Sequence, residues 1–185
     1  MSNVFFTSDT HFYHGNIIRY CNRPWLHQGD LTTSGDWVSK DISDARSVEM
    51  SEVLISNWNS VVSPGDKVFH LGDFSFKKNI LEIRKRLNGE IHLVVGNHDR
   101  IGEVNKAGFE WVTKDSLSIN IEGVQFVMSH RPLINTTNEV IHLHGHCHGT
   151  KGMLSQSNVL DVGVDVLKFF PISLGFVLSL VRRSL

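Results

Sequence analysis

Short apolar runs that each end in a histidine- or carboxylate-bearing motif constrain this chain most strongly. Five such motifs occur in order: Asp9-Thr10-His11, Gly72-Asp73, Gly96-Asn97-His98-Asp99, Ser129-His130 and Gly145-His146-Cys147-His148. The preceding runs are rich in branched and aromatic residues, which is typical of buried strands. Rigid elements of this kind would aim their terminal side chains at one point. The sequence therefore predicts a site at the ends of strands.

The order of the expected elements predicts the fold class. The apolar runs cover residues 4–6, 67–71, 91–95, 124–128 and 140–143, and amphipathic helices are expected over residues 49–59 and 80–87. Strands that alternate with helices in the first half indicate an α/β arrangement with parallel pairing.

The second half of the chain has a different pattern. Residues 117–121 and 124–128 flank Glu122-Gly123, which is a hairpin signal, and residues 159–166 alternate again. We therefore expect a second, partly antiparallel sheet. Ser173 would cap a last helix that runs to Arg183.

Length and charge limit the partners of the chain. Its 185 residues suit one compact domain, residues 1–185. Lys and Arg total 18 against 19 for Asp and Glu, so no broad basic field would draw the protein to nucleic acid or to acidic lipid. Nucleic acid is therefore not indicated as a partner, and any phosphate must be bound locally.

Cysteine usage and hydropathy suggest a cytoplasmic protein. Cys21 and Cys147 make no disulfide framework, and we expect two reduced thiols in the cytoplasm. The expected first strand begins at Val4 and leaves no room for a removable leader. Charged residues and Pro171 interrupt the apolar stretch over residues 159–181, which we expect in the core rather than in a membrane.

Residues 24–46 are a long polar stretch with interspersed tryptophans. Long loops without structure of their own are usually functional or disordered. This one is either a lid over the site or a surface excursion that Trp25 and Trp37 hold in place.

The motifs supply the donors that a pair of divalent cations requires. Two cations about 3.5 to 4 Å apart need a carboxylate that bridges them, with imidazoles and oxygens on either side. Asp73 is the candidate bridge. A mixture of nitrogen and oxygen donors favours Mn, Fe, Zn, Co or Ni over Ca or Mg. Cys147 lies between two candidate ligands, and we expect it only to pack.

In order and in type, the five motifs resemble those of the calcineurin-like metallophosphoesterases, with Asp-x-His, Gly-Asp, Gly-Asn-His-Asp or Glu, His, and Gly-His-x-His. The resemblance extends from Asp9 to His148. The flanking Phe12-Tyr13-His14 and Arg23-Pro24-Trp25 look like the small bacterial and phage-type branch. The resemblance implies a four-layer α/β/β/α sandwich, in which helices flank two mixed sheets and a dimetal site lies at the strand ends.

The resemblance also implies the roles of the motif residues. The first metal would be held by Asp9, His11, Asp73 and His148, and the second by Asp73, Asn97, His130 and His146. The two ions would be divalent, with Mn foremost. In the family a metal-activated hydroxide attacks phosphorus in line, and the histidine at the position of His98 stands by the leaving group.

His98 would protonate the departing oxygen, or donate a hydrogen bond to it, which is worth about 10² to 10⁴ in rate for a positioned acid. Asp99 would orient its ring. His14 would either contact the substrate phosphate or cap the following helix. Arg100 and Arg131 lie next to site residues, and either would bind phosphate oxygens in a bidentate manner.

The remaining histidines are expected to be structural. His142 and His144 share the strand that delivers His146 and would support the site or fill the core. Asp161 and Asp165 would be able to pair with such supporting histidines. The histidines without a motif partner are His27, His70 and His92.

These features predict a metal-dependent phosphoesterase that acts on phosphomonoesters or phosphodiesters, with a nucleotide or another small phosphorylated compound as the substrate. Two alternatives remain: a non-catalytic interaction scaffold that retains the fold, or a nuclease that acts on nucleic-acid ends. Substrate choice would depend on the loops over residues 24–46 and 135–139.

Overall fold

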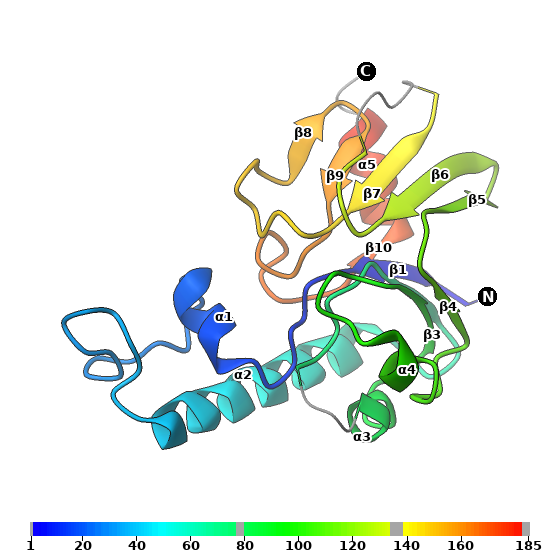
Figure 1. Ribbon diagram of the computed structural model, residues 1–185. Helices are drawn as coiled ribbons and strands as arrows, with labels where there is room; N and C mark the ends of the chain where they lie inside the picture. Colours follow the sequence, from blue (N-terminus) through cyan, green and yellow to red (C-terminus); the bar gives the residue numbers. More distant parts are fainter. Residues whose placement is uncertain (1, 77–79, 134–138, 183–185) are drawn as a thin grey trace.

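The computed structural model describes residues 2–76, 80–133 and 139–182. Within these residues the chain forms two five-stranded mixed sheets, and helices lie beside them (Figure 1). The two sheets confirm the predicted α/β class.

The first sheet is mainly parallel and has the strand order β10-β1-β2-β3-β4. Its strands are β1 (Val4–Thr7), β2 (Lys67–His70), β3 (Glu90–Val94), β4 (Trp111–Thr113) and β10 (Ile172–Ser173). The first four strands pair in parallel, and β10 pairs antiparallel with β1. The carboxyl ends of β1, β2 and β3 therefore share one edge of the sheet, just before Asp9, Asp73 and Asn97.

The second sheet has the order β5-β6-β7-β9-β8. Its strands are β5 (Leu117–Ile121), β6 (Val124–Ser129), β7 (Ile141–His144), β8 (Leu154–Gln156) and β9 (Val159–Asp161). The outer pairs are antiparallel and the inner pairs parallel, as the predicted partly antiparallel sheet requires. Glu122 and Gly123 have φ values of 53° and 84°, and positive values at both positions suit the predicted hairpin turn.

Alternation along the first sheet divides the core in two. Val68 packs with the helices on one face, whereas its neighbour Phe69 packs toward the second sheet. Between the sheets the ring of Phe6 stacks on Phe69 and on Phe126, with centroids 5.8 and 5.7 Å apart. Each sheet thus buries apolar side chains against the other.

Helices cover the other face of the first sheet (Figure 1). They are α2 (Lys40–Val61), α3 (Ile80–Arg84) and α4 (Ile101–Val104), and α1 (Gly15–Tyr20) precedes α2. The helices predicted over residues 49–59 and 80–87 are both present, although α2 is longer than predicted and α3 ends earlier. α2 begins earlier, at Lys40, where the Ser39 hydroxyl accepts a hydrogen bond of 3.2 Å from the Ile42 amide.

The predicted C-terminal helix is α5 (Leu174–Arg182). The Ser173 hydroxyl accepts a hydrogen bond of 3.3 Å from the Phe176 amide, so Ser173 caps the helix as predicted. Arg183 lies outside the described residues. Val177 and Val181 are buried, which agrees with the expectation of core. No helix in the described part of the chain is long and apolar enough to cross a membrane.

Residues 24–46 do not form one continuous loop. Residues from Lys40 onward belong to α2, and Ser39 caps this helix. The expected loop therefore includes the N-cap and the first turns of α2. The rest is attached to α1: Trp37 Nε1 donates to Asn16 Oδ1 at 3.0 Å, and Arg19 pairs with Asp36 at 2.9 Å. Figure 1 shows this segment projecting beside α1. These contacts are those of a surface excursion held at its base.

The four-layer sandwich stays a prediction. Helix content is low, and the buried residues of α5 join the apolar cluster between the sheets, rather than a separate outer layer. Most of the expected specificity loop over residues 135–139 lies outside the described residues.

Candidate metal centre

All five motifs meet where the carboxyl ends of both sheets come together. β1, β2 and β3 of the first sheet deliver Asp9, Asp73 and Asn97, and β6 and β7 of the second deliver His130 and His146. Parallel strands place their carboxyl ends at a common edge, which is why residues far apart in sequence converge here.

One group of side chains surrounds Asp9. His11 Nε2 lies 4.0 Å from Asp9 Oδ1 and 3.5 Å from Asp73 Oδ2. His148 Nε2 lies 3.9 Å from Asp9 Oδ1. Asp9, His11 and His148 each offer a ligand atom, and these atoms lie within 4.8 Å of one another, so the group would be able to hold a metal ion.

A second group lies on the other side of Asp73. His130 Nε2 is 3.5 Å from Asp73 Oδ2 and 2.9 Å from Asn97 Oδ1, and the rings of His130 and His146 are 5.1 Å apart. Asp9, Asp73 and His130 again offer atoms within 4.8 Å of one another. Asp73 therefore faces both groups, as a bridging carboxylate must.

Several ligand atoms in these groups are buried without a hydrogen-bond partner. Among the described residues, Asp9 Oδ1 and both ring nitrogens of His11 have none. Buried polar groups in folded proteins are almost always satisfied by protein, water or an ion. Nitrogen and oxygen donors that converge on one point fit a divalent transition metal. The residues present thus fit the metal that the motifs imply.

The backbone is strained at the same residues. Asp9, His11, Asp73, His146 and His148 have φ values of 58°, 47°, 55°, 67° and 45°. Positive φ is uncommon for residues other than glycine and costs about 1–3 kcal/mol each. Such strain concentrates at functional sites, where the surrounding structure maintains it.

Two glycines allow a close approach of chains at the site. A Cβ on Gly96 would collide with Asp73 Oδ1 and the Asp73 amide, and one on Gly145 with Ser8 Oγ and Asp9 Oδ2. Neither position has room for a larger residue. Gly96 and Gly145 therefore let the second and third motifs, and the fifth and first, pack directly against each other.

Burial sets the charge of the site. It raises the pKa of Asp9 to about 7 and holds the pKa of His11 well below its usual value. Burial also lowers the pKa of His148, but Asp165, Cys21 and Asp9 outweigh it and raise that pKa to about 10. A divalent cation would favour the ionised form of Asp9 and compete with the proton on His148.

His98 has the exposure of a group that meets a substrate. Its side chain is exposed, its ring centroid lies 5.7 Å from that of His11, and its amide donates to Asp73 Oδ1 at 2.8 Å. A backbone tie to the candidate bridge holds this ring beside the buried ligands.

The structure does not place Asp99 where it was expected. Its carboxylate accepts hydrogen bonds of 2.8 Å from the amides of Asp73, Phe74 and Gly96. With its oxygens so engaged, Asp99 joins the loops after β2 and β3 instead of orienting the His98 ring. Three backbone donors in reach outcompete one exposed imidazole.

His14 occupies the N-cap position of α1, but its side chain makes no capping hydrogen bond. The alternative that His14 caps this helix through its side chain is therefore not supported. Its ring instead stacks on Phe76, with centroids 3.6 Å apart. Arg131 lies within the site, and its guanidinium donates to His146 Nε2 at 2.9 Å and to Asn97 Oδ1 at 3.3 Å. Arg100 is exposed, 3.5 Å from Glu103, in the cavity that His98 also lines.

The remaining histidines lie behind or away from the cluster. His142, His144 and His70 are buried, and His142 Nε2 lies 2.9 Å from Ser129 Oγ. His27 is near Glu49 at the surface, and His92 stacks on Phe69. Both cysteines are free.

Of the two aspartates expected behind the histidines, Asp165 Oδ2 lies 2.8 Å from His148 Nδ1, whereas Asp161 accepts from the Gly149 and Gly163 amides. Two residues that contact the site, Phe76 and Arg23, were not predicted from the sequence. Phe76 has no motif of its own, and no sequence signal links Arg23 with Asp165.

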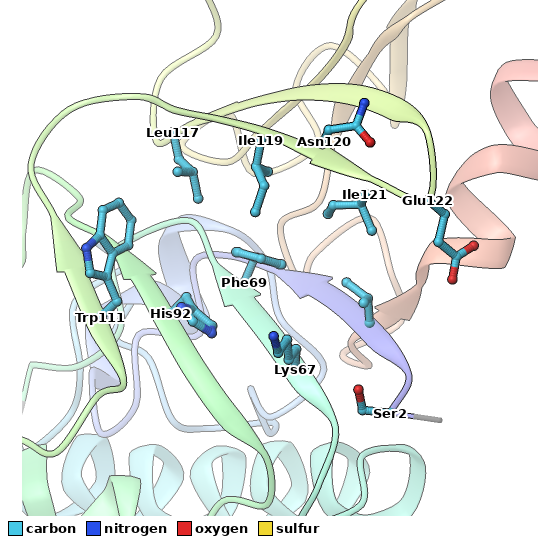
Figure 2. Close-up of a pocket in the computed structure, with 11 residues that line it drawn as sticks. Ser2, Lys67, Phe69, His92, Trp111, Leu117, Ile119, Asn120, Ile121 and Glu122 are labelled. Carbon is cyan, nitrogen blue, oxygen red and sulfur yellow. The ribbon is translucent and has the colours of Figure 1, made fainter.

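Two cavities are lined in part by the Gly96-Asn97-His98-Asp99 loop. One of about 610 Å³ is lined by His130, Arg131 and Lys114 among others, and one of about 320 Å³ by His98, Phe76 and Arg100 among others. A third, of about 440 Å³, lies between the sheets at the opposite end of β2 (Figure 2). Phe69 and Ile119 line it, and none of the candidate metal ligands does.

Comparison with known proteins places the chain among uncharacterized relatives. No family model matches it. The solved structure of the protein of unknown function AQ665 from Aquifex aeolicus has a TM-score of 0.72 and 26% identity, over 97% of this chain and 100% of that one. An archaeal phosphodiesterase structure has a TM-score of 0.46 and 17% identity, over 87% and 82%. A similarity as low as this last one carries no argument about fold or function.

The uncharacterized protein MJ1445 of Methanocaldococcus jannaschii is 31% identical over 195 residues, which cover 100% of this chain and 94% of that protein. The chain therefore belongs to the same protein family as MJ1445.

Proposed function

We propose that the protein is a metal-dependent phosphoesterase of the calcineurin-like type. The proposal includes a single domain over residues 1–185 and the four-layer arrangement that this type implies. One observation carries it: Asp9 Oδ1 and the ring of His11 are buried, face Asp73 and His148, and have no hydrogen-bond partner within the described part of the chain.

The ligand sets are proposed as the motifs imply. Asp73 would be shared between a first ion held with Asp9, His11 and His148 and a second held with Asn97, His130 and His146. We propose Mn²⁺, because the donors mix imidazole nitrogen with carboxylate and amide oxygen. When bound, the ions would supply an activated water and neutralise charge on the phosphoryl oxygens.

The chain's own residues would bind the phosphate and move one proton. Arg131 has planar donors directed at Asn97 and His146, and it would turn those donors to two phosphoryl oxygens. His98 would give the proton of its imidazolium to the departing ester oxygen. The hydrogen bond from its backbone amide to Asp73 Oδ1 holds this residue beside the ligand cluster.

We propose a small phosphorylated compound, foremost a nucleotide, as the substrate, and a cytoplasmic location suited to the two free thiols. The cavities of about 320 and 610 Å³ beside His98 and Arg131 are in the usual size range of small-molecule sites. The balance of 18 basic and 19 acidic residues offers little general attraction for nucleic acid.

Hydrolysis of aryl phosphomonoesters and phosphodiesters tests the proposal. The chelator-treated protein should be inactive and should recover activity with Mn²⁺. A panel of cyclic nucleotides, dinucleotides and monoesters would then identify the preferred class. If metal-loaded protein hydrolyses none of these, the non-catalytic scaffold takes the place of the enzyme. Activity confined to nucleic-acid ends would indicate the nuclease instead.

A further inference from the structure

The buried guanidinium of Arg23 joins two segments of the candidate metal centre. Its side chain has no exposed surface, and the residue as a whole is 1% exposed. It lies between the Asp9-Thr10 backbone and Asp165, and Asp165 also contacts His148. A buried charge is costly to maintain unless it is fully paired, so its partners are informative.

Every donor of this guanidinium has a partner. Nε donates to Asp165 Oδ1 at 2.8 Å, and Nη2 donates to Asp165 Oδ2 at 2.9 Å and to the Asp9 carbonyl at 2.8 Å. Nη1 donates to the Thr10 carbonyl at 3.2 Å and to Met50 Sδ at 3.3 Å. An arginine has five N–H donors in a planar fork, and lysine has three on one atom, so lysine cannot reproduce this set.

The contacts lead to the ring of His148. Asp165 Oδ2, which Arg23 holds in place, lies 2.8 Å from His148 Nδ1, and His148 Nε2 lies 3.9 Å from Asp9 Oδ1. A carboxylate that accepts from one ring nitrogen fixes the tautomer and aims the other nitrogen at a metal. The same guanidinium also holds the carbonyl of Asp9, so Asp9 and His148 are set relative to each other through Arg23.

We propose that Arg23, acting through Asp165, is the positioning residue of the first metal site. This inference deepens the proposed function and rests on it. Neither side chain would touch the ion or the substrate. Their role is to present Nε2 of His148 and the Asp9 carboxylate at a fixed separation, while the second site relies on Asn97, His130 and His146.

Mn²⁺ binding to chelator-treated protein, measured by calorimetric titration, tests the proposal. In Arg23→Lys and Asp165→Asn, the affinity of one of the two sites should fall by about 10- to 100-fold, the usual effect of losing such support, while the other site is unchanged. Excess Mn²⁺ should restore turnover, because the reacting groups are intact.

The structure supplies a matched control. Arg46, in α2, also pairs through two hydrogen bonds with an aspartate. Its partner is Asp30, in the segment attached to α1, at 2.7 and 3.2 Å. Arg46→Lys should leave both Mn²⁺ affinities at the wild-type value. If Arg23→Lys instead weakens both sites equally, or neither, Arg23 is only a structural residue and the proposal is overturned.

A measurement on the wild-type protein keeps the proposal testable if the variants do not fold. In ¹⁵N-histidine spectra with diamagnetic Zn²⁺ bound, His148 should carry its proton on Nδ1 and bind metal through Nε2. The opposite assignment would overturn the proposal. Wild-type protein that binds no metal would overturn the proposed function as well, whereas normal binding by folded Arg23→Lys would overturn this inference alone.

Discussion

At the scale of single residues, the candidate centre combines buried ligands with exposed groups. Asp9 and His11 are almost fully buried, whereas His98 and Arg131 are exposed. Buried ligands keep their geometry because packing restricts them, and exposed groups are free to meet a substrate. Metal binding and chemistry should therefore respond to different substitutions.

His98→Ala and Asp73→Ala should separate the two functions. His98→Ala should keep its metal and lose about 10² to 10⁴ in kcat, since only the proton donor is removed. Asp73→Ala should lose metal and activity together, because Asp73 faces both ligand groups. Elemental analysis beside a phosphodiester assay would check both. Equal metal loss in the two variants would contradict the role of His98.

A second prediction at this scale concerns acid stability. Burial lowers the pKa of His70 to about 3, from the value of about 6.5 that is usual for histidine. Because the unfolded chain binds this proton more tightly, the contribution of neutral His70 is present above pH 6.5 and is lost as the pH falls toward 3. The loss is about 1.4 kcal/mol per pH unit.

Urea unfolding with chelator at pH 7 and pH 5 would measure this contribution. Wild-type protein should lose about 2 kcal/mol more stability over that interval than His70→Gln, whose amide does not titrate. Equal losses in the two proteins would show that the protein does not lose stability through protonation of His70 over this pH range.

At the scale of elements, loops rather than strands carry the site. The strands end just before the motifs, and the loops fold back so that motifs far apart in sequence touch. The Asp99 carboxylate joins the loops after β2 and β3 through three backbone amides. Metal affinity should therefore depend on the conformation of these loops.

Gly96→Ala tests this dependence on loop geometry. Its Cβ would collide with Asp73, and the resulting shift should cost about 1–3 kcal/mol and disturb metal binding. Gly102→Ala, in the nearby α4, is the matched control, because no neighbouring atom of the described residues lies within 4 Å of a Cβ placed there. That variant should keep its metal and be up to about 1 kcal/mol more stable in thermal unfolding. Normal metal binding by Gly96→Ala would argue against the close contact.

The elements that the sequence predicted are those with a local signal. The hairpin at Glu122-Gly123 and the apolar runs before the motifs have such signals, and they were found. The strands β4, β8 and β10 have two or three residues each, which is too short for a period. α2 was predicted too short because its first turns are polar and exposed, and they resemble a loop.

The site shows the same division. Its ligand candidates were predictable because they occur as short motifs at strand ends. The pairing of Arg23 with Asp165 was not predictable, since 142 positions separate them and only the folded chain brings them together. Asp99 was expected to orient His98 because the two residues are adjacent in sequence. The partners that the structure gives it are backbone amides, which a sequence does not reveal.

At the scale of the whole molecule, the centre joins the two sheets. The first sheet leads into Asp9, His11 and Asp73, and the second leads into His130 and His146. An ion held by both would connect the halves of the fold. Metal should therefore stabilise the protein as a whole, because binding to the folded state alone shifts the unfolding equilibrium.

Metal removal should lower the melting temperature. At Mn²⁺ concentrations of about 100 Kd, binding contributes about 2.7 kcal/mol, which corresponds to roughly 5 to 10 °C for a chain of this size. Calorimetry with and without chelator would measure the difference, and Ca²⁺ at equal ionic strength is the control. Asp73→Ala should show little shift. A Mn²⁺ effect no larger than that of Ca²⁺ would contradict specific binding.

The central claim, that these motifs form a dinuclear metal centre, is tested most directly by counting bound ions. Equilibrium dialysis of chelator-treated wild-type protein against Mn²⁺, followed by elemental analysis, should give about two ions per chain. Binding of no Mn²⁺, or the same binding by a chain that carries Asp73→Ala, would contradict the account.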